Sequence, residues 1–286
     1  MSEAIVTTPE LSDGYAYQHT TWPVAGAIRA RLLILHGVQS HAGWYPNLGR
    51  TLAEKGFEAH FPDRRGSGAN QRDRGHTPSA DRLLLDVVEQ LRALRAATPA
   101  VPVGLVGISW GGKLAVITAG NHPGLVDALA LICPGLMPRV GVSPSERLRI
   151  AFAYFFNRRK LFAVPLADPA LFTDNPEGQS FIAADPLALR KATAGLLAAS
   201  TFIDRKVQAI VKKLHQPTLL MLAGQDRIVD NAKTLAYAKT LATTDLEVIE
   251  YPQGHHTLEF DPDPSRYAND LADWFGSKLS LPRTER

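Results

Sequence analysis

Three places in the sequence hold side chains that together could carry out nucleophilic catalysis. Ser109 lies in the pentapeptide Gly-Ile-Ser-Trp-Gly, Asp226 follows the apolar run TLLMLAG, and the pair His255 and His256 follows the run LEVIEYP. A serine hydroxyl attacks an acyl carbonyl when a histidine takes its proton and a carboxylate orients that histidine. The order serine, acid, histidine along the chain is a known arrangement of such a triad. The sequence therefore predicts a serine hydrolase with Ser109 as its nucleophile.

The segment around Ser109 has the composition of a tight turn between a strand and a helix. The apolar run VGLVG leads into it, and the helical pattern GGKLAVITAG follows. Such a nucleophile elbow strains the backbone at the serine and needs small residues at Gly107 and Gly111. A chance match in a glycine-rich loop would not have these flanking patterns. The similar stretch RGSG at 65–68 lacks a helical pattern after it, and we interpret it as a turn after a strand ending at Asp63.

The acid and the base are expected at the ends of two later strands. Asp226 lies two residues past Gly224, at the predicted carboxyl end of its strand. Asp230 is the alternative acid, but its position before the helical pattern AKTLAYAKT is typical of a helix N-cap. One of His255 and His256 is the expected base. The two side chains point in different directions, so only one of them can serve, and the residues alone leave that choice open.

Two backbone N–H groups are predicted to hold the oxyanion that forms during acyl transfer. One belongs to Trp110, the residue after the nucleophile, and the other to Val38, in the loop that follows the strand ending at His36. Each such donor contributes about 2.7–4 kcal/mol in the transition state. We interpret His36 as bracing this loop, whereas His41 either lines the pocket or faces solvent.

Short apolar runs alternate with amphipathic segments, which indicates an α/β fold with a mostly parallel sheet flanked by helices on both faces. The predicted strands are 31–37, 57–63, 103–109, 128–135, 218–224 and 246–252, with an antiparallel edge strand in 15–22. The predicted helices are 45–56, 79–97, 111–120, 232–242 and 264–279. The alternation stops at 136–213, a proline-punctuated stretch predicted to be a helical cap or lid on a core made of 1–135 and 214–286.

Composition and charge give no indication of nucleic acid binding, disulfide bonds, metal sites or membrane spans. The 286 residues carry 31 basic and 28 acidic side chains in mixed order, which gives no indication of nucleic acid binding. The single cysteine, Cys133, lies in an apolar run and is expected to be a buried, inert thiol. None of the nine histidines belongs to a helical H-x-x-x-H pair, so neither a metal site nor a cofactor is predicted. No secretory signal or membrane span is recognised, and the expected location is cytoplasmic.

Five segments together resemble the monoacylglycerol lipase and lysophospholipase branch of the α/β-hydrolases. They are LHGVQSHAGWYPNLGRTLAEKGFEAHFPDRRGSG, GISWGG, AADPLALR, LLMLAGQDRIVD and YPQGHHTLEF. The resemblance runs from about residue 30 to the C-terminus and is weak over 136–180. It implies the α/β-hydrolase fold, with His256 as the base because it precedes the Thr-Leu pair. It also implies Asp226 as the acid and Val38 as the second oxyanion donor. The bulky Trp110 and the first half of the cap depart from the family pattern.

The predicted cap is the guide to the substrate, a small-molecule acyl ester. It begins with LRIAFAYFFNRRKLF, in which many apolar residues accompany Arg147, Arg149, Arg158, Arg159 and Lys160. One hypothesis is a lid over a medium or long acyl chain, with the basic side chains near an anionic lipid surface. The alternative is a helix that packs its aromatic residues on the core and leaves its charges in solvent.

Two other functions are compatible with the residues. The first is a peptidase or amidase similar to proline iminopeptidase, which needs an acidic group in the cap to hold a substrate amine. The candidate acids are Asp168, Asp174, Glu177 and Asp185. The second is a non-catalytic ligand-binding homologue, which would have no need of a complete triad. Ser109 argues against the dehalogenases and epoxide hydrolases of this fold, since those enzymes use an aspartate nucleophile.

Overall fold

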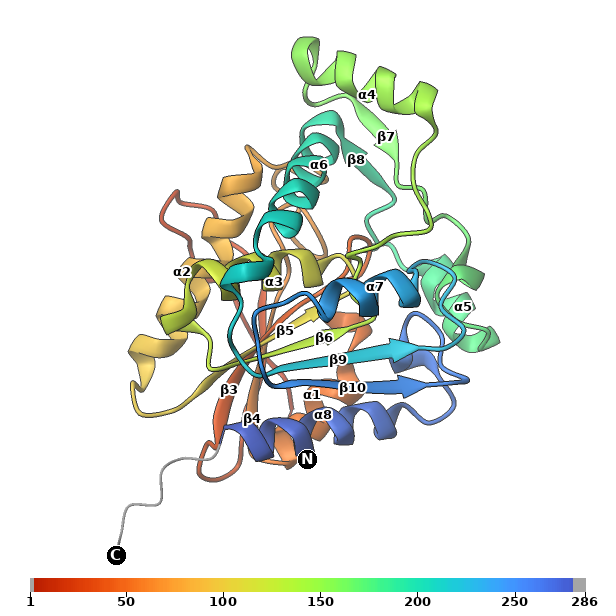
Figure 1. The fold of residues 1–286 in the computed structure, drawn as a ribbon. Coiled ribbons are helices and arrows are strands. Elements are labelled where there is room, and N and C mark those ends of the chain that lie inside the picture. Colours follow the sequence, from red (N-terminus) through yellow and green to blue (C-terminus); the bar gives the residue numbers. More distant parts are fainter. Residues whose placement is uncertain (1–2, 280–286) are drawn as a thin grey trace, which may run out of the picture.

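An eight-stranded sheet carries the predicted active-site residues. The computed structural model describes residues 3–279, and its sheet has the strand order β1-β2-β4-β3-β5-β6-β9-β10 (Figure 1). The strands are β1 Ile5–Thr7, β2 His19–Trp22, β3 Ala30–Leu35, β4 Phe57–Pro62, β5 Val103–Ile108, β6 Ala128–Ile132, β9 Thr218–Ala223 and β10 Leu246–Tyr251. From β4 to β10 every neighbouring pair is parallel, so the carboxyl ends of these strands share one edge. The six strands predicted for this part of the sheet are all present.

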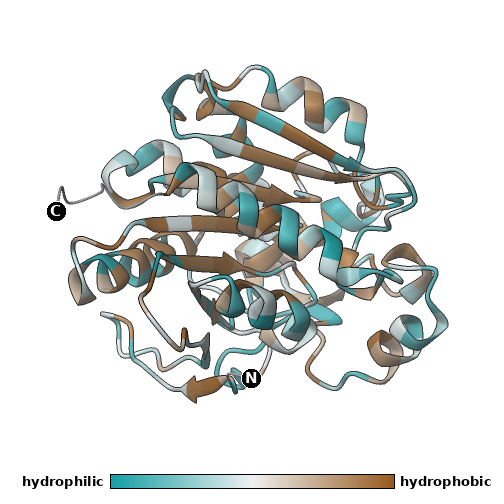
Figure 2. Cartoon of the chain, turned by 90° about the horizontal axis from the view of Figure 1, so that it is seen from below, coloured by the Kyte–Doolittle hydropathy of each residue, from teal (hydrophilic) through white to brown (hydrophobic). Residues whose placement is uncertain are grey.

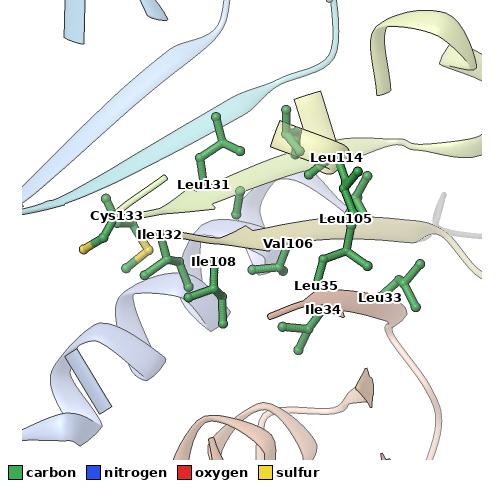
Figure 3. Close-up of a cluster of buried hydrophobic side chains, with 14 of the residues drawn as sticks. Leu33, Ile34, Leu35, Leu105, Val106, Ile108, Leu114, Leu131, Ile132 and Cys133 are labelled. Atoms are coloured by element: carbon green, nitrogen blue, oxygen red, sulfur yellow. The ribbon is translucent and has the colours of Figure 1, made fainter. Parts of the chain in front are cut away.

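The central strands form the core of the molecule. Every residue of β3, β5, β6 and β9 is buried, because helices cover both faces of a parallel sheet. The strands accordingly appear as brown, hydrophobic bands in Figure 2. Figure 3 shows their side chains packed together, from Leu33 on β3 to Cys133 at the end of β6. The Cys133 thiol is fully buried, as predicted, and burial raises its pKa well above the usual value.

The start of the sheet differs from the prediction in one respect. β2 is antiparallel to β4, as expected. It is not an edge strand, however, because β1 pairs with its other side and places Ile5 opposite Thr21. All three side chains of β1 are exposed. A three-residue strand with no buried side chain has no alternating pattern, so the sequence contains no signal for it.

Helices lie on both faces of the sheet. The core helices are α1 Pro46–Glu54, α2 Ala80–Ala97, α3 Gly111–Asn121, α7 Asn231–Ala238 and α8 Pro264–Lys278. Figure 1 shows α1 and α8 together below the sheet and α2 and α3 above it. Side chains at the N-caps explain where two of the helices begin. Ser79 accepts a hydrogen bond from the Arg82 N–H at the start of α2, and Asp230 accepts one from the Lys233 N–H at the start of α7.

A separate group of elements is inserted between β6 and β9. It consists of α4 Pro144–Phe156, β7 Leu161–Ala163, α5 Pro176–Ala184, β8 Lys191–Thr193 and α6 Ala194–Ala209, with short 3-10 helices at Pro169–Leu171 and Val211–Lys213. β7 and β8 form an antiparallel pair of their own. α6 contacts both α4 and the core helices α2 and α3, and thereby joins α4 and the β7–β8 pair to the core (Figure 1).

The remaining 3-10 helices lie in the loops of the core, at Ala42–Trp44, Pro123–Leu125 and Leu258–Phe260. None of the helices between residues 3 and 279 has the length and apolar character that crossing a membrane requires.

Candidate active site

Ser109 lies at a sharp turn between β5 and α3. Its φ angle is +51°, a left-handed conformation that side-chain-bearing residues rarely adopt. The Ser109 N–H donates to the Ile132 carbonyl on β6 at 3.0 Å, and the Ser109 carbonyl accepts from the Gly135 N–H at 2.7 Å. A Cβ atom at Gly107 would lie 2.6 Å from the Gly112 Cα across the turn. The requirement for a small residue there agrees with the predicted elbow.

His256 lies between Ser109 and Asp226. Its Nε2 is 2.8 Å from the Ser109 Oγ, and its Nδ1 is 2.8 Å from the Asp226 Oδ2. The imidazole side chain is 2% exposed and the Asp226 side chain 0% exposed, so both contacts are shielded from water. Three side chains from the ends of β5, β9 and β10 therefore form one continuous hydrogen-bonded chain. The geometry suits proton transfer from the serine hydroxyl to a histidine held by a carboxylate.

The Asp226 carboxylate is held in place by its own loop. Its Oδ1 accepts from the Ile228 N–H at 2.7 Å and from the Val229 N–H at 2.8 Å, which leaves Oδ2 for His256. Asp230, the alternative acid, caps α7 instead and is directed to the Lys233 N–H.

The neighbouring His255 is engaged elsewhere. Its Nε2 is 2.9 Å from Asp174 and its Nδ1 is 3.3 Å from Asp261, so both ring nitrogens face carboxylates rather than Ser109. Within residues 3–279, no group of three or more histidine, cysteine or acidic side chains is arranged to hold a metal ion. Of the two histidines, His256 is the one whose ring reaches the Ser109 hydroxyl.

The loop after β3 brings a second backbone segment against the nucleophile. A Cβ atom at Gly37 would lie 3.3 Å from the Ser109 Cβ, so the loop touches the serine directly. His36 braces this loop, since its Nδ1 is 2.8 Å from the Gly37 carbonyl and its Nε2 accepts the Arg64 N–H at 2.9 Å. Burial holds the pKa of His36 well below its usual value, which keeps the ring neutral, with one donor and one acceptor nitrogen.

The two N–H groups predicted to hold the oxyanion belong to residues on either side of Ser109. Val38 follows Gly37 in the loop, and Trp110 follows the nucleophile at the start of α3. Neither N–H donates a hydrogen bond to another residue of the described chain. Both N–H groups thus lack an acceptor in the described chain, as an oxyanion hole requires.

A hollow in front of Ser109 leaves about 280 Å³ of unfilled space, part of it open to solvent. It is lined by Gly37, Val38, Gln39, Ser40, Trp44, Tyr45, Ile108, Ser109, Leu166, Phe172, His256 and Thr257. Leu166 and Phe172 come from the insertion between β6 and β9. The Phe172 ring packs edge-on against His256, with 6.0 Å between ring centroids. The predicted cap segment thus contributes directly to the walls of the site.

Two residues near the hollow are absent from the sequence prediction. Gln39 is 2% exposed, and neither its Oε1 nor its Nε2 has a hydrogen-bond partner. Arg64 donates to the carbonyls of Gly37 and Val38. The position of Arg64 directly after the strand end at Asp63 is the one sequence signal that could have drawn attention to it.

His41, which the sequence analysis did name, does not line the hollow. Its Nε2 is 3.1 Å from Asp185.

Known proteins resemble this chain over most of its length. The family model described as Serine aminopeptidase, S33 (Hydrolase_4) matches residues 26–263. A monoacylglycerol lipase of Mycolicibacterium smegmatis is 24% identical over 272 residues, covering 93% of this chain and 95% of that protein. The human monoglyceride lipase is 24% identical over 240 residues, covering 83% of this chain and 78% of its own length.

The fold is also found in solved structures. A soluble variant of the monoglyceride lipase from Saccharomyces cerevisiae, in complex with a substrate analogue, superposes with a TM-score of 0.81 at 20% identity. The superposition covers 96% of this chain and 97% of the yeast chain. The predicted α/β-hydrolase fold is confirmed.

Proposed function

The chain belongs to the Serine aminopeptidase, S33 family, and from that premise we propose that it cleaves carboxylic esters, with Ser109 as nucleophile, His256 as base and Asp226 as the acid. The α/β-hydrolase fold is that of lipases and esterases. The observation that carries the proposal is the position of His256, with one ring nitrogen 2.8 Å from the serine hydroxyl and the other 2.8 Å from Asp226.

The proposed reaction proceeds through an acyl-enzyme. The Ser109 Oγ attacks the carbonyl carbon of the ester while the His256 Nε2 takes its proton, and the N–H groups of Val38 and Trp110 stabilise the oxyanion. His256 then protonates the leaving alcohol, and the acyl group remains on Ser109. A water molecule, deprotonated by His256, releases the acid in the second half. Asp226 keeps the His256 Nδ1 proton in place and stabilises the imidazolium in both halves.

An ester is favoured over an amino-terminal peptide because the site offers no carboxylate for an amine. None of the described residues that line the hollow is acidic. Asp185 accepts the Trp44 indole N–H at 2.7 Å and also contacts His41, while Asp174 forms an ion pair with Arg227. The other two candidate acids, Asp168 and Glu177, are exposed and do not line the hollow. A free ammonium group would therefore have no carboxylate partner among the described residues that line the hollow.

The unpaired amide of Gln39 favours an ester whose alcohol part carries free hydroxyl groups. An amide with both polar atoms buried and unpaired is costly unless a ligand supplies the missing hydrogen bonds. A substrate hydroxyl can both accept from Nε2 and donate to Oε1. We therefore propose a glycerol monoester as the substrate class, in keeping with the lipases named above.

Esters are expected to be hydrolysed far faster than amino-acid amides. With purified wild-type protein, kcat/KM for a monoacylglycerol is expected to exceed that for an amino-acid p-nitroanilide by about a hundredfold or more, because the amine of the amide lacks a charged partner. Hydrolysis is measured by fatty acid release for the ester and by absorbance for the anilide.

The methyl ester of the same fatty acid is the matched control for the alcohol group. A monoacylglycerol is expected to exceed it in kcat/KM by about tenfold, since only the glycerol ester can satisfy Gln39. Comparable rates for the two esters would contradict the role of Gln39. Preference for the amino-acid amide would establish the peptidase alternative instead.

We also propose that the insertion contacts a lipid surface through α4. Four apolar side chains at spacings of three, four or one lie along its outer face: Leu148, Phe152, Phe155 and Phe156, which are 73%, 64%, 78% and 75% exposed. The opposite face packs Ile150 and Ala153 against the β7–β8 pair and α6. Large exposed apolar patches mark interaction sites, and the basic residues that follow α4 suit an anionic membrane.

Replacing Phe155 and Phe156 together by serine is expected to lower partitioning onto phosphatidylglycerol-containing vesicles by at least about tenfold, because each buried phenylalanine contributes roughly 1.5–3 kcal/mol. Vesicle co-sedimentation measures the effect. The matched control is Val248→Ser, an exposed apolar residue on β10, which is expected to leave partitioning unchanged. Equal partitioning of the double variant and the wild type would contradict the proposal, whereas hydrolysis of a short soluble ester is expected to remain normal in all three proteins.

A further inference from the structure

Arg64 lies between the two backbone segments that supply the proposed oxyanion donors. It follows β4, and its guanidinium donates from Nη1 to the Gly37 carbonyl and from Nη2 to the Val38 carbonyl, both at 3.0 Å. Nη2 also donates to the Ser67 Oγ at 2.7 Å. The centre of the guanidinium lies 4.7 Å from the centroid of the Trp110 ring. A single side chain thus touches both residues whose N–H groups are the proposed oxyanion donors.

The contact with Gly37 determines which way one peptide group faces. The Gly37 carbonyl receives hydrogen bonds from Arg64 and from the His36 ring. In a planar trans peptide, the N–H of the next residue points opposite to that carbonyl. Holding the carbonyl toward Arg64 therefore turns the Val38 N–H away from Arg64 and leaves it for the site. Without these donors the peptide could rotate, and its carbonyl would repel an oxyanion.

The contact with Trp110 supports the second donor. A guanidinium over an aromatic ring is attracted by about 0.5–2 kcal/mol, depending on how well it is shielded from water. The indole N–H of Trp110 donates in addition to the Ser200 Oγ on α6 at 2.9 Å. Trp110 is therefore held from two sides, and its backbone N–H begins α3 directly after the nucleophile.

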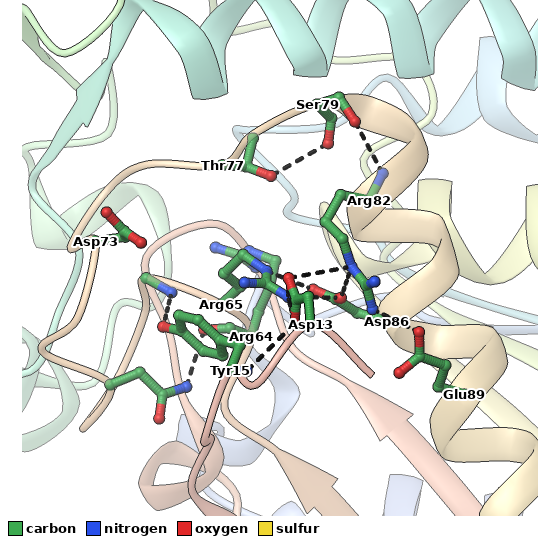
Figure 4. Close-up of polar contacts among 12 residues, drawn as sticks. Asp13, Tyr15, Arg64, Arg65, Asp73, Thr77, Ser79, Arg82, Asp86 and Glu89 are labelled. Atoms are coloured by element: carbon green, nitrogen blue, oxygen red, sulfur yellow. Dashed lines mark hydrogen bonds and ion pairs between the residues drawn. The ribbon is translucent and has the colours of Figure 1, made fainter. Parts of the chain in front are cut away.

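Arg64 differs from its neighbour Arg65 in the partners of its charge. Arg65 forms ion pairs with Asp13 and Asp86, as Figure 4 shows. No carboxylate of the described chain forms an ion pair with Arg64, whose side chain contacts two carbonyls, a hydroxyl and a ring. Burial lowers the pKa of Arg64 to about 10, so the group remains charged at neutral pH. Arg64 is half-buried, and a partly desolvated cation without an ion-paired carboxylate is costly, which points to a function for it.

We propose that Arg64 is a positioning residue for the oxyanion hole, which holds the Val38 N–H and the Trp110 backbone in the arrangement that receives the developing negative charge. The inference rests on the proposed ester hydrolysis. It concerns the transition state only, because Arg64 does not line the hollow in front of Ser109.

The test is Arg64→Met in the full-length protein, assayed with a soluble p-nitrophenyl ester. We expect kcat to fall about 10–100-fold while KM changes by less than about twofold, as for a contribution made only in the transition state. A trifluoromethyl ketone, which forms a tetrahedral oxyanion adduct with the serine, is expected to lose affinity by a similar factor. A non-hydrolysable ether analogue, which forms no oxyanion, is expected to bind normally.

Arg65→Met is the matched control, since it removes a neighbouring buried arginine that touches neither donor segment. It is expected to lower the melting temperature while leaving kcat of the folded protein within about threefold. If Arg64→Met does not fold, Arg64→Lys replaces it. Lysine keeps the charge but lacks the planar fork with which the guanidinium reaches both carbonyls and the Trp110 ring together, so kcat and ketone affinity are again expected to fall together, by about 3–10-fold.

Folded Arg64 variants with wild-type kcat would overturn the inference, and so would variants whose kcat falls while ketone affinity is unchanged. Both results leave the proposed function intact, because the wild type still hydrolyses the ester. Failure of the wild-type protein to hydrolyse any ester would instead overturn the proposed function and this inference with it.

Discussion

Replacing Ser109 by alanine is expected to lower kcat for ester hydrolysis by about a thousandfold or more. The substitution removes the only atom that could attack the ester carbon at the end of the Asp226–His256 chain, whereas the oxyanion donors and the hollow remain. The measurement is initial rates with p-nitrophenyl esters from acetate to palmitate. The wild-type optimum along this series additionally reports the acyl-chain length that the hollow accepts.

Ser145→Ala is the control for this variant, since Ser145 is exposed at the start of α4 and far along the chain from the triad. It is expected to retain wild-type activity. A fluorophosphonate probe is expected to label the wild type and Ser145→Ala but not Ser109→Ala. Absence of both hydrolysis and labelling in well-folded wild-type protein would contradict serine catalysis and favour the non-catalytic ligand-binding alternative.

The two adjacent histidines give the second large effect. His256→Ala is expected to lower kcat by about 10³–10⁴-fold, since a serine hydroxyl without its base is a poor nucleophile at neutral pH. His255→Ala is expected to leave kcat within about threefold, because both its ring nitrogens face Asp174 and Asp261 rather than the serine. The measurement is kcat of the two variants side by side, with the melting temperature of each as a check on folding.

His255→Ala is expected to change stability rather than activity. Burial raises the pKa of Asp261, and hydrogen bonds from the His255 backbone and ring offset that effect. Removing the His255 ring leaves Asp261 with fewer partners, so His255→Ala is expected to lower the melting temperature by a few degrees. Loss of activity in His255→Ala with normal activity in His256→Ala would reverse the assignment of the base.

The parallel sheet could be predicted because its strands are buried on both faces. Continuous apolar runs such as 103–108 and 218–223 have no other stable location in a globular chain, and the amphipathic segments between them must cover the sheet. The short strand β1 could not be predicted, because its side chains are exposed and its pairing rests on backbone hydrogen bonds alone. The composition of α4 could not show whether its aromatic residues pack on the core or lie exposed, because composition does not say which side of a helix is covered.

The amino-acid sequence by itself indicated Ser109 as the candidate nucleophile. The elbow is a local structure, in which neighbouring residue types dictate the turn, and the φ angle of +51° at Ser109 follows from them. It likewise determined Asp230 as an N-cap, which depends on a contact three residues away.

Only the tertiary structure shows that His256, and not His255, contacts Ser109, because that contact depends on side-chain directions relative to a serine about 150 positions earlier. Only the tertiary structure, too, brought Arg64 against both Gly37 and Trp110, and left the Gln39 amide unpaired in the hollow. Contacts between segments distant in the chain depend on how three strand ends and the insertion pack together. That packing results from burial of the whole core, and the residues that flank a single strand end do not specify it.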